Sequence, residues 1–317
     1  SKFTLMTDWI PAIEALKKQK NAVILAHYYQ NDDIQDIADF IGDSLALAQA
    51  AVKTQADIIV FAGVHFMAET AKILNPSKKV LLPDMLAGCS LADSCPASEF
   101  EKFIALHPGH TVISYVNTTA AVKALTDIVC TSSNVVQIVE SLPKDEKIIF
   151  GPDRNLGNYI NNLTGRNMVV WDGACHVHER FSLPAILELR KQHPGAKILA
   201  HPECPRPILI VSDHIGSTSE LLRFSKTSEA SEFIVATEPG IIHQMKKGSP
   251  DKIFFPAPPE DASCGCNDCQ FMKMITLRKI YDCLKDEKGE ILLDRELMEK
   301  ASRPIMRMME LSEKFKL

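Results

Sequence analysis

The feature that most constrains the fold is a unit of about 87 residues that occurs three times in the chain. Each copy opens with a short apolar run that ends in polar residues: NAVILAHYY, TVISYVN and AKILAHPE. Short apolar runs rich in β-branched residues are typical of buried parallel strands. The polar residues that end these runs begin with the anchors His27, Tyr115 and His201. Seventeen residues beyond each anchor stands a hydroxyl residue: Ser44, Ser132 and Thr218.

Two further strand-like segments repeat in the same register. The second group begins 34 or 35 residues beyond the anchors (FAG, FGP, VAT), and the third begins 52 or 53 residues beyond them (VLLP, MVVW, IFFP). This period is too long for a solenoid, whose units span ~20–50 residues. We therefore predict an α/β fold of three similar αβα domains with small parallel sheets, related by a pseudo-threefold axis, with the active site at their junction. The predicted boundaries are 1–95, 96–181 and 182–271, followed by C-terminal helices in 272–317 that pack back on the repeats.

Composition indicates a soluble, mildly acidic globular protein. The 317 residues are 46% hydrophobic and carry a net charge of -5. Lysine and arginine are scattered, which argues against nucleic-acid binding. No apolar run approaches the ~18–20 residues that cross a membrane, and the amphipathic start lacks a signal-peptide core, so we expect a cytoplasmic protein. In that compartment nine cysteines favour metal ligation over a disulfide framework.

The first copy illustrates how the anchors reach a site. A helix is expected over residues 7–20 and a strand over 22–26, after which the chain continues as helix, turn and helix. His27 and Tyr29 end the strand, and the period-two alternation of a strand points both to one side. Ligands of parallel sheets bind at this carboxyl edge, although a strand-end histidine often only closes the core.

The hydroxyl residues of the repeat stand in GDS, TSS and GSTS, each at an expected helix start. A serine there commonly caps the helix and does no more. The same position offers free N–H groups and the positive end of the helix dipole, which suit a phosphate or carboxylate. Three such starts in register predict a pocket for a substrate with several anionic groups.

Each copy also carries cysteine shortly after its last strand. Cys89 lies in a glycine-containing loop, Cys175 begins the sequence CHVH, and the third copy has the spacing C-x-C-x-x-C at Cys264, Cys266 and Cys269. One thiolate from each copy would leave one iron of a 4Fe-4S cluster without a protein ligand, and that iron would be a Lewis acid. The remaining cysteines are expected to be packed in the core or at a helix start: Cys95, Cys130, Cys204 and Cys283.

A mononuclear zinc site is the alternative for the CHVH sequence. Cys175, His176 and His178 would be its ligands, but structural zinc sites usually pair two knuckles and no second one lies nearby.

Glu203 is the predicted general base. It lies two residues beyond the anchor His201 in the proline-rich loop HPECPRP, which holds a carboxylate in place before proton transfer. A surface glutamate in a salt bridge is the alternative. The other two copies place Tyr29 and Asn117 at this position, so a carboxylate occurs there once.

Nine motifs in this order resemble the quinolinate synthase family: AHYYQ, GDS, PDMLAGCSLAD, YVNTTAAVKA, TSSN, GACHVHERF, HPECP, GSTS and the C-x-C-x-x-C loop before FMKM. The resemblance covers nearly the whole chain and implies three αβα domains about a pseudo-threefold axis. It also implies condensation of iminoaspartate with dihydroxyacetone phosphate to quinolinate, with release of phosphate and water and without net redox change. Iminoaspartate would come from an aspartate oxidase or dehydrogenase.

The resemblance further implies the site residues. One 4Fe-4S cluster would be held by Cys89, Cys175 and Cys269; the family spacing C-x-x-C-x-x-C differs here at Cys264. Substrate-binding residues carried over from the family are His27, Tyr29, Ser44, Tyr115, Asn117, Ser132, His178, His201, Glu203, Ser217 and Thr218. Candidates for catalytic proton transfer are Glu203, Tyr29, His27 and His201. The competing class is a non-catalytic iron–sulfur or zinc sensor that binds a small anionic metabolite.

Overall fold

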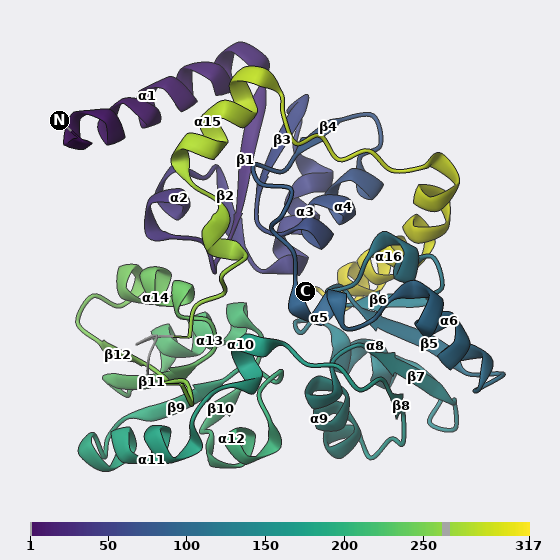
Figure 1. Cartoon of the computed structure of the whole chain (residues 1–317). Helices are drawn as coiled ribbons and strands as arrows, with labels where there is room; N and C mark the ends of the chain where they lie inside the picture. Colours follow the sequence, from purple (N-terminus) through teal and green to yellow (C-terminus); the bar gives the residue numbers. More distant parts are fainter. Residues whose placement is uncertain (1, 262–266) are drawn as a thin grey trace.

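Three four-stranded parallel sheets organise the molecule (Figure 1). The structure, a computed structural model, describes residues 2–261 and 267–317. The first sheet contains β1 (Ala22–His27), β2 (Phe40–Gly42), β3 (Ile58–Ala62) and β4 (Lys79–Leu81). The second contains β5 (Thr111–Tyr115), β6 (Ile128–Cys130), β7 (Ile148–Gly151) and β8 (Val169–Val170). The third contains β9 (Lys197–Ala200), β10 (His214–Ile215), β11 (Glu232–Ala236) and β12 (Ile253–Pro256).

The three sheets share one strand order, which confirms the predicted fold class. In the first sheet it is β2-β1-β3-β4, and the other two repeat it strand for strand. The central strands are apolar because helices cover both faces of each sheet; Ile24 and Val60, paired across β1 and β3, are both fully buried.

The first and third units each have one strand more than predicted, whereas in the second unit the apolar segment DIVCT was expected to be a strand and forms β6. The segment expected to run as helix, turn and helix contains β2, a strand of three residues between two helices. Such a short edge strand carries too few residues for a period-two pattern to be visible, and Phe40 at its start is exposed. The N-terminal helix also begins earlier than predicted, at residue 2.

Helices flank the sheets and form the rim of the molecule. Those of the first two units are α1 (Lys2–Lys20), α2 (Asp32–Ile37), α3 (Ser44–Lys53), α4 (His65–Leu74), α5 (Ser90–Asp93), α6 (Ala97–Ala105), α7 (Ala120–Lys123), α8 (Val135–Ser141), α9 (Arg154–Thr164) and α10 (His176–Glu179). Those of the third unit and the C-terminal segment are α11 (Leu183–Gln192), α12 (Arg206–Val211), α13 (Thr218–Thr227), α14 (Ile242–Gly248), α15 (Leu277–Asp286) and α16 (Arg295–Lys314).

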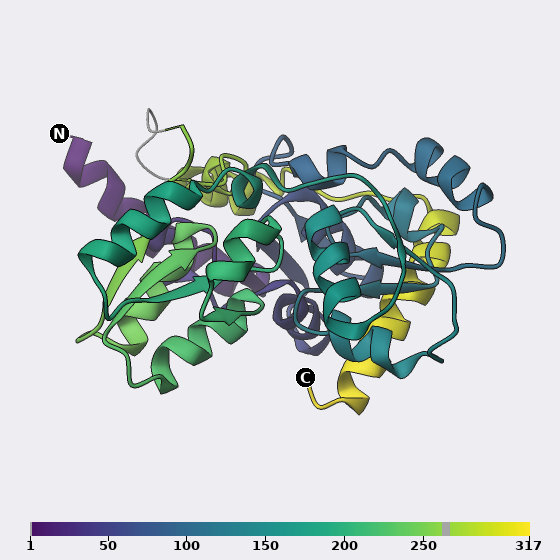
Figure 2. The same ribbon diagram turned by 90° about the horizontal axis from the view of Figure 1, so that it is seen from below.

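The C-terminal helices pack on the first two units. Helix α15 lies against α1 and β3, and α16 contacts α4, α7 and β6. Figure 2 shows α16, in yellow, running along the second unit while the third unit, in green, stands on the other side. A single large apolar cluster therefore joins the first two units and the C-terminal helices, whereas the third sheet has separate clusters on its two faces.

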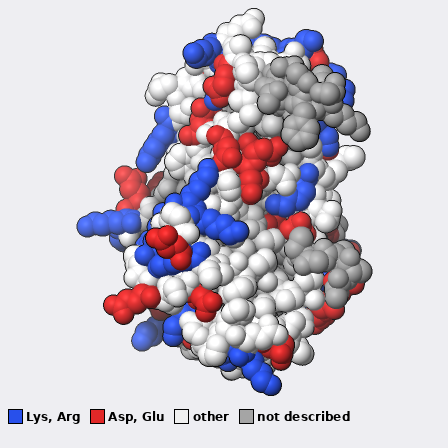
Figure 3. Space-filling model, turned by 90° about the vertical axis from the view of Figure 1, so that its left-hand side faces the viewer, with Lys and Arg blue, Asp and Glu red and all other residues white. Residues whose placement is uncertain are grey.

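Charges of both signs are interspersed on the face shown in Figure 3. No helix in the described part of the chain is both long and apolar enough to span a membrane.

Candidate active site

A buried cavity of about 70 Å³ lies where the three units meet. It collects strand-end and loop residues from all three sheets because the carboxyl ends of parallel strands carry the loops that bind ligands. Thirteen of the fourteen predicted site residues line it: His27, Tyr29, Ser44, Cys89, Tyr115, Asn117, Ser132, Cys175, His178, His201, Glu203, Thr218 and Cys269. The fourteenth, Ser217, faces a second, outer cavity of about 470 Å³ and caps α13 by accepting from the N–H of Glu220.

Glu203 is the electrostatic centre of the cavity. Its Oε1 accepts a hydrogen bond from the phenol of Tyr115, and its Oε2 lies 3.0 Å from Nδ1 of His178. Burial alone would raise the pKa of Glu203, but the neighbouring imidazoles of His178 and His201 and these hydrogen bonds bring it to about 2. The carboxylate is therefore ionised and has both oxygens held.

Two buried histidines of the cavity are neutral. Burial lowers the pKa of His27 to about 4, against the opposing effect of Asp43, and lowers the pKa of His201 to about 3, against the opposing effect of Glu203. Nδ1 of each ring accepts a hydrogen bond from a backbone N–H two residues later, from Tyr29 and from Glu203 respectively. In each ring the proton is consequently on Nε2, and Nε2 of His201 lies 3.2 Å from the hydroxyl of Ser132.

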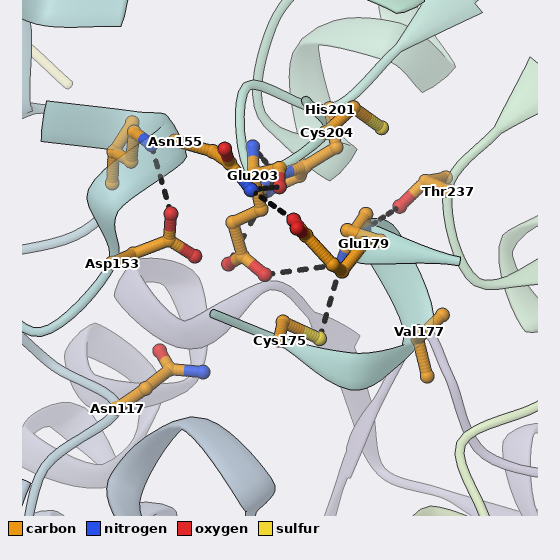
Figure 4. A network of polar contacts seen from close by, with 12 residues as sticks. Asn117, Asp153, Asn155, Cys175, Val177, Glu179, His201, Glu203, Cys204 and Thr237 are labelled. Atoms are coloured by element: carbon orange, nitrogen blue, oxygen red, sulfur yellow. Dashed lines mark hydrogen bonds and ion pairs between the residues drawn. The ribbon is translucent and has the colours of Figure 1, made fainter. Parts of the chain in front are cut away.

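The loop that carries Glu203 is anchored by the second unit (Figure 4). The amide of Asn155 donates to the backbone oxygen of Glu203 at 3.1 Å and to Glu179 at 2.6 Å. Asp153 lies nearby, fully buried, and caps α9 through the N–H of Leu156. Burial and the charge of Glu203 raise the pKa of Asp153 well above its usual range, which leaves Glu203 as the charged carboxylate of the pair.

Tyr29 is held by two threonines of the third unit. Its hydroxyl lies 2.7 Å from Oγ1 of Thr218 and 2.8 Å from Oγ1 of Thr237. Thr237 in turn lies 2.8 Å from Nε2 of His178. Burial, followed by the charge of Glu203, raises the pKa of Tyr29 well above 10, so its phenol keeps its proton.

The helix starts differ from one copy to the next. Ser44 and Thr218 are the first residues of α3 and α13, as predicted. Ser132 is not at a helix start: α8 begins at Val135 because the side chain of Asn134 closes a turn by accepting from the N–H of Thr131.

Asp43 connects the three units beside these residues. One carboxylate oxygen caps α3 by accepting from the N–H of Ala46 at 3.0 Å. The other accepts from the hydroxyls of Ser133 at 2.6 Å and Ser219 at 2.7 Å, which belong to the second and third units. Asp43 borders both the inner and the outer cavity, so this contact, the Asp43 clasp, forms part of the wall between them.

The three predicted metal ligands converge in the cavity. Burial raises the pKa of Cys89 to about 12 and that of Cys269 to about 11. Burial, Glu203 and the two neighbouring thiols raise the pKa of Cys175 well above its usual range. The amide of Asn117 lies 3.9 Å from the sulfur of Cys89, and Nδ1 of His178 lies 3.3 Å from that of Cys175. Three thiols in this setting ionise together only beside a cation, so the residues fit a metal cofactor.

The geometry around Cys175 differs from the predicted zinc alternative. Cys175, His178 and Glu203 bring ligand atoms within 4.8 Å of one another and form a metal-competent group. His176 points elsewhere, with Nδ1 2.6 Å from the hydroxyl of Ser90.

The other described cysteines are structural. Cys95, Cys130, Cys204 and Cys283 are buried, and the seven described cysteines are all free thiols. Cys264 and Cys266 lie outside the described residues.

Three buried residues of the site were missed by the motif analysis: Asp43, Thr237 and Glu238. Glu238 accepts from the N–H of Cys269 at 3.1 Å and from that of Gly240 at 2.6 Å, which fixes the loop of the third cysteine. Burial raises the pKa of Glu238 to about 7, against the opposing effect of Lys273. Thr237 and Glu238 follow the second strand of the third copy (VATEPG), so the strand-end register could have identified them.

Fold and site together define a class of protein: an α/β enzyme of three similar units with a buried, thiol-lined cavity at their junction. Comparison with known proteins places the chain within that class. The family model described as quinolinate synthetase A protein matches residues 11–310. The chain belongs to this family.

Curated relatives agree along nearly their whole length. Quinolinate synthase of a Synechococcus strain is 58% identical over 308 residues, which is 97% of this chain and 96% of the relative. The enzyme of the same name from Thermosynechococcus vestitus is also 58% identical, with 97% of each chain covered. That from Chloroherpeton thalassium is 56% identical over 305 residues, or 96% of this chain and 95% of the relative.

Proposed function

We propose that this protein is a quinolinate synthase of NAD biosynthesis, which condenses iminoaspartate with dihydroxyacetone phosphate to quinolinate and releases phosphate and water. Family membership supports the reaction class. The observation that carries the proposal is that one thiol from each unit lines the same small cavity: Cys89, Cys175 and Cys269. The ionised carboxylate of Glu203 lines this cavity as well.

The proposed cofactor is one 4Fe-4S cluster held by Cys89, Cys175 and Cys269. Three cysteines from three separate loops leave one iron without a protein ligand, and such an iron, when the cluster is bound, supplies a Lewis acid for dehydration. The proposed reaction joins the two substrates by a carbon–carbon bond and releases phosphate and water, with no net redox change.

The remaining residues act on the substrates directly. Together the two substrates bring two carboxylates and one phosphate, and the first residues of α3 and α13, Ser44 and Thr218, present a helix N-terminus and a hydroxyl to them. Ser132 adds a hydroxyl from its turn. Glu203 is the proposed base for the carbon acids of the substrates because its carboxylate lies in the cavity beside the thiol of Cys175.

The inner cavity leaves little free room for a ligand. At about 70 Å³ and with the Asp43 clasp closed, the inner cavity holds little more than a few water molecules. Binding of both substrates therefore requires the units to separate slightly. The predicted domain boundaries 1–95, 96–181, 182–271 and 272–317 remain part of the proposal.

The decisive experiment is anaerobic purification, followed by counting of iron and sulfide and by turnover. We expect about four irons and four sulfides per chain, and quinolinate identified by mass spectrometry only when both substrates are supplied, with iminoaspartate generated by an aspartate oxidase or dehydrogenase. Omission of dihydroxyacetone phosphate is the control. Zinc in place of iron would contradict the cofactor, and a fully loaded protein that binds substrates without product would favour a sensor.

A further inference from the structure

The three strand-end turns that reach the cavity share one plan. In each unit a helix begins five residues after the anchor: α2 after His27, α7 after Tyr115 and α12 after His201. In the first and third turns the anchor is a histidine. Its carbonyl oxygen accepts from the N–H three residues later, and its Nδ1 accepts from the N–H two residues later. Tyr115 has no ring nitrogen, so the second turn cannot form the latter hydrogen bond.

The second turn is held by a buried lysine instead. The hydroxyl of Thr118 donates to the carbonyl oxygen of Tyr115 at 3.0 Å. Lys123, the last residue of α7, donates from Nζ to the carbonyl oxygens of Val116 at 2.7 Å and Thr118 at 2.5 Å, and to the hydroxyl of Thr118 at 3.1 Å. These three oxygens match the three hydrogens of an ammonium group. The two carbonyl groups flank Asn117, so Lys123 holds the turn on both sides of that residue.

Gln35 occupies the same place in the first unit, eight residues after the anchor. Its side-chain amide donates to the carbonyl oxygens of Tyr28 at 3.0 Å and Gln30 at 2.9 Å. These two carbonyl groups are the repeat equivalents of those of Val116 and Thr118. The contact is therefore a feature of the repeat, made once by an amide and once by an amine.

The third unit holds its turn from outside. Leu209 stands eight residues after the anchor and has no donor. Asn155 of the second unit donates to the carbonyl oxygen of Glu203 at 3.1 Å in its place. Each turn that carries a cavity side chain thus has a side-chain donor to its backbone.

Lys123 lies in the core of the protein. It is 1% exposed, and its Nζ lies 5.7 Å from the centre of the ring of Phe66, a residue that lines the cavity. Burial lowers the pKa of Lys123 to about 7, against the opposing effect of Glu69. Removing an amine from water costs free energy unless it is hydrogen-bonded, so the contacts with the turn are what stabilise Lys123 here.

We propose that Lys123 is a positioning residue for the reaction, which grips the turn on both sides of Asn117 and thereby fixes the Asn117 amide in the cavity. This inference rests on the proposed function, in which Asn117 binds substrate. Asn117 lines the cavity, and its amide lies 3.9 Å from the sulfur of Cys89. Figure 4 shows its side chain extending from the loop toward the network around Glu203.

The test compares two replacements of the lysine. Lys123→Met has a similar length but no donor, whereas Lys123→Gln copies the residue of the first unit. We expect Lys123→Met to lower kcat/KM by roughly 10- to 100-fold with unchanged iron content, because small misplacements of a binding group can cost about 10²-fold. Lys123→Gln should stay within about threefold of the parent.

Lys72→Met is the matched control. Lys72 is also buried, and its Nζ donates to the carbonyl oxygens of Pro76 at 3.1 Å and Lys78 at 2.8 Å, beyond the end of α4. Both Lys→Met variants should lose stability against denaturant, but Lys72→Met should keep kcat/KM within about threefold of the parent. A loss of kcat/KM as large as that of Lys123→Met would attribute the effect to any missing buried lysine and overturn the inference.

A double-mutant cycle with Asn117→Ala tests the route of the effect. If Lys123 acts through Asn117, Lys123→Met should lower kcat/KM by less than about threefold in the Asn117→Ala background, because the positioned amide is already gone. Effects that multiply independently would overturn the inference. So would a Lys123→Met enzyme within threefold of the parent, or a Lys123→Gln enzyme as poor as Lys123→Met.

Thr118→Val is a milder change in the same turn. It keeps the buried lysine but removes the hydroxyl between Nζ of Lys123 and the carbonyl oxygen of Tyr115. We expect kcat/KM to fall by about 3- to 10-fold with full iron. If Lys123→Met does not fold, this variant decides, and a Thr118→Val enzyme equal to the parent would overturn the inference.

A binding series separates the inference from the proposed reaction. Affinity of the iron-loaded protein for malate, a dicarboxylate, should fall about tenfold in both Lys123→Met and Asn117→Ala and be kept in Lys123→Gln and Lys72→Met. An iron-loaded parent that binds malate but makes no quinolinate would contradict the proposed function alone. Equal malate affinities in Lys123→Met and the parent would reject the positioning role.

Discussion

Nδ1 of His178 lies 3.0 Å from Oε2 of Glu203. His178 lies on α10, after the second sheet, and Glu203 lies in the loop after β9 of the third sheet. The same imidazole nitrogen is 3.3 Å from the sulfur of Cys175. His178 therefore contacts both the proposed base, Glu203, and a proposed metal ligand, Cys175. A substitution at either residue is expected to affect the other through this imidazole.

Glu203→Gln tests the base. The amide keeps the shape and most hydrogen bonds, but it cannot take a proton, and loss of a general base typically lowers the rate by ~10²–10⁴-fold. We expect quinolinate formation to fall by at least roughly the lower figure, with iron content unchanged. Turnover within about a factor of three of the parent would make Glu203 a positioning residue and move the search for the base to Tyr29 or His27.

Replacement of single cysteines by alanine tests the ligand set. Cys89→Ala, Cys175→Ala and Cys269→Ala should each lose the cluster, because each removes one of three thiols that face the cavity. Cys130→Ala and Cys204→Ala serve as controls and should keep full iron, since both thiols are buried in the core. A Cys269→Ala protein with full iron, alongside a Cys264→Ala or Cys266→Ala protein without it, would show that the third ligand is wrong.

Ser44→Ala and Thr218→Val test the helix starts as anion sites. Asp43 and Ser217 already cap α3 and α13, so Ser44→Ala should leave the free energy of unfolding nearly unchanged. Thr218→Val also removes the hydrogen bond to the phenol of Tyr29, so it should lower the free energy of unfolding by about 0.5–1.5 kcal/mol. Affinity for phosphate or a dicarboxylate should fall by ~1–3 kcal/mol for each lost hydrogen bond to a charged ligand. Ser132→Ala, in the turn before α8, should weaken binding of the same ligands by a similar amount. Unchanged affinity in all three variants would show that these residues have no binding role.

The Asp43 clasp predicts a stability effect. The double change Ser133→Ala and Ser219→Ala keeps the cap on α3 but removes both hydroxyl donors to a buried carboxylate oxygen. We expect the free energy of unfolding to fall by roughly 2–5 kcal/mol, measured with denaturant. Ser302→Ala, whose exposed hydroxyl donates to the oxygen of Glu299, is the control, and an equal effect there would argue against the clasp.

Acid sensitivity should depend on His27. The pKa of His27 is about 4 in the folded protein, whereas an exposed histidine of the unfolded chain has its ordinary pKa of 6.5. Between these two pH values the unfolded chain therefore binds more protons than the folded protein. Stability is therefore lost as the pH falls from 6.5 toward 4, by about 3 kcal/mol from this group at most. His27→Gln should make the denaturation midpoint depend less on pH between 6.5 and 4. His110→Gln, outside the cavity, should leave this pH dependence unchanged.

The sequence by itself determined the three-unit architecture. Strand periodicity and a constant spacing between strand ends and hydroxyl residues are local properties, and they predicted the parallel sheets and a site at the strand ends. The family resemblance added His178 and Cys269 to that site, and both line the cavity. Resemblance of ordered motifs then indicated the family that the comparisons confirm.

Only the tertiary structure decided which side chains meet across the axis. Asp43 binds Ser133 and Ser219, and Thr237 joins Tyr29 to His178, across separations of 59 to 208 residues. Spacing along the chain does not specify such partners, because they depend on how three units rotate against one another. The late start of α8, which takes Ser132 off a helix, likewise follows from Asn134, whose amide is held by Ser312 of α16 at 3.0 Å, a contact 178 residues away.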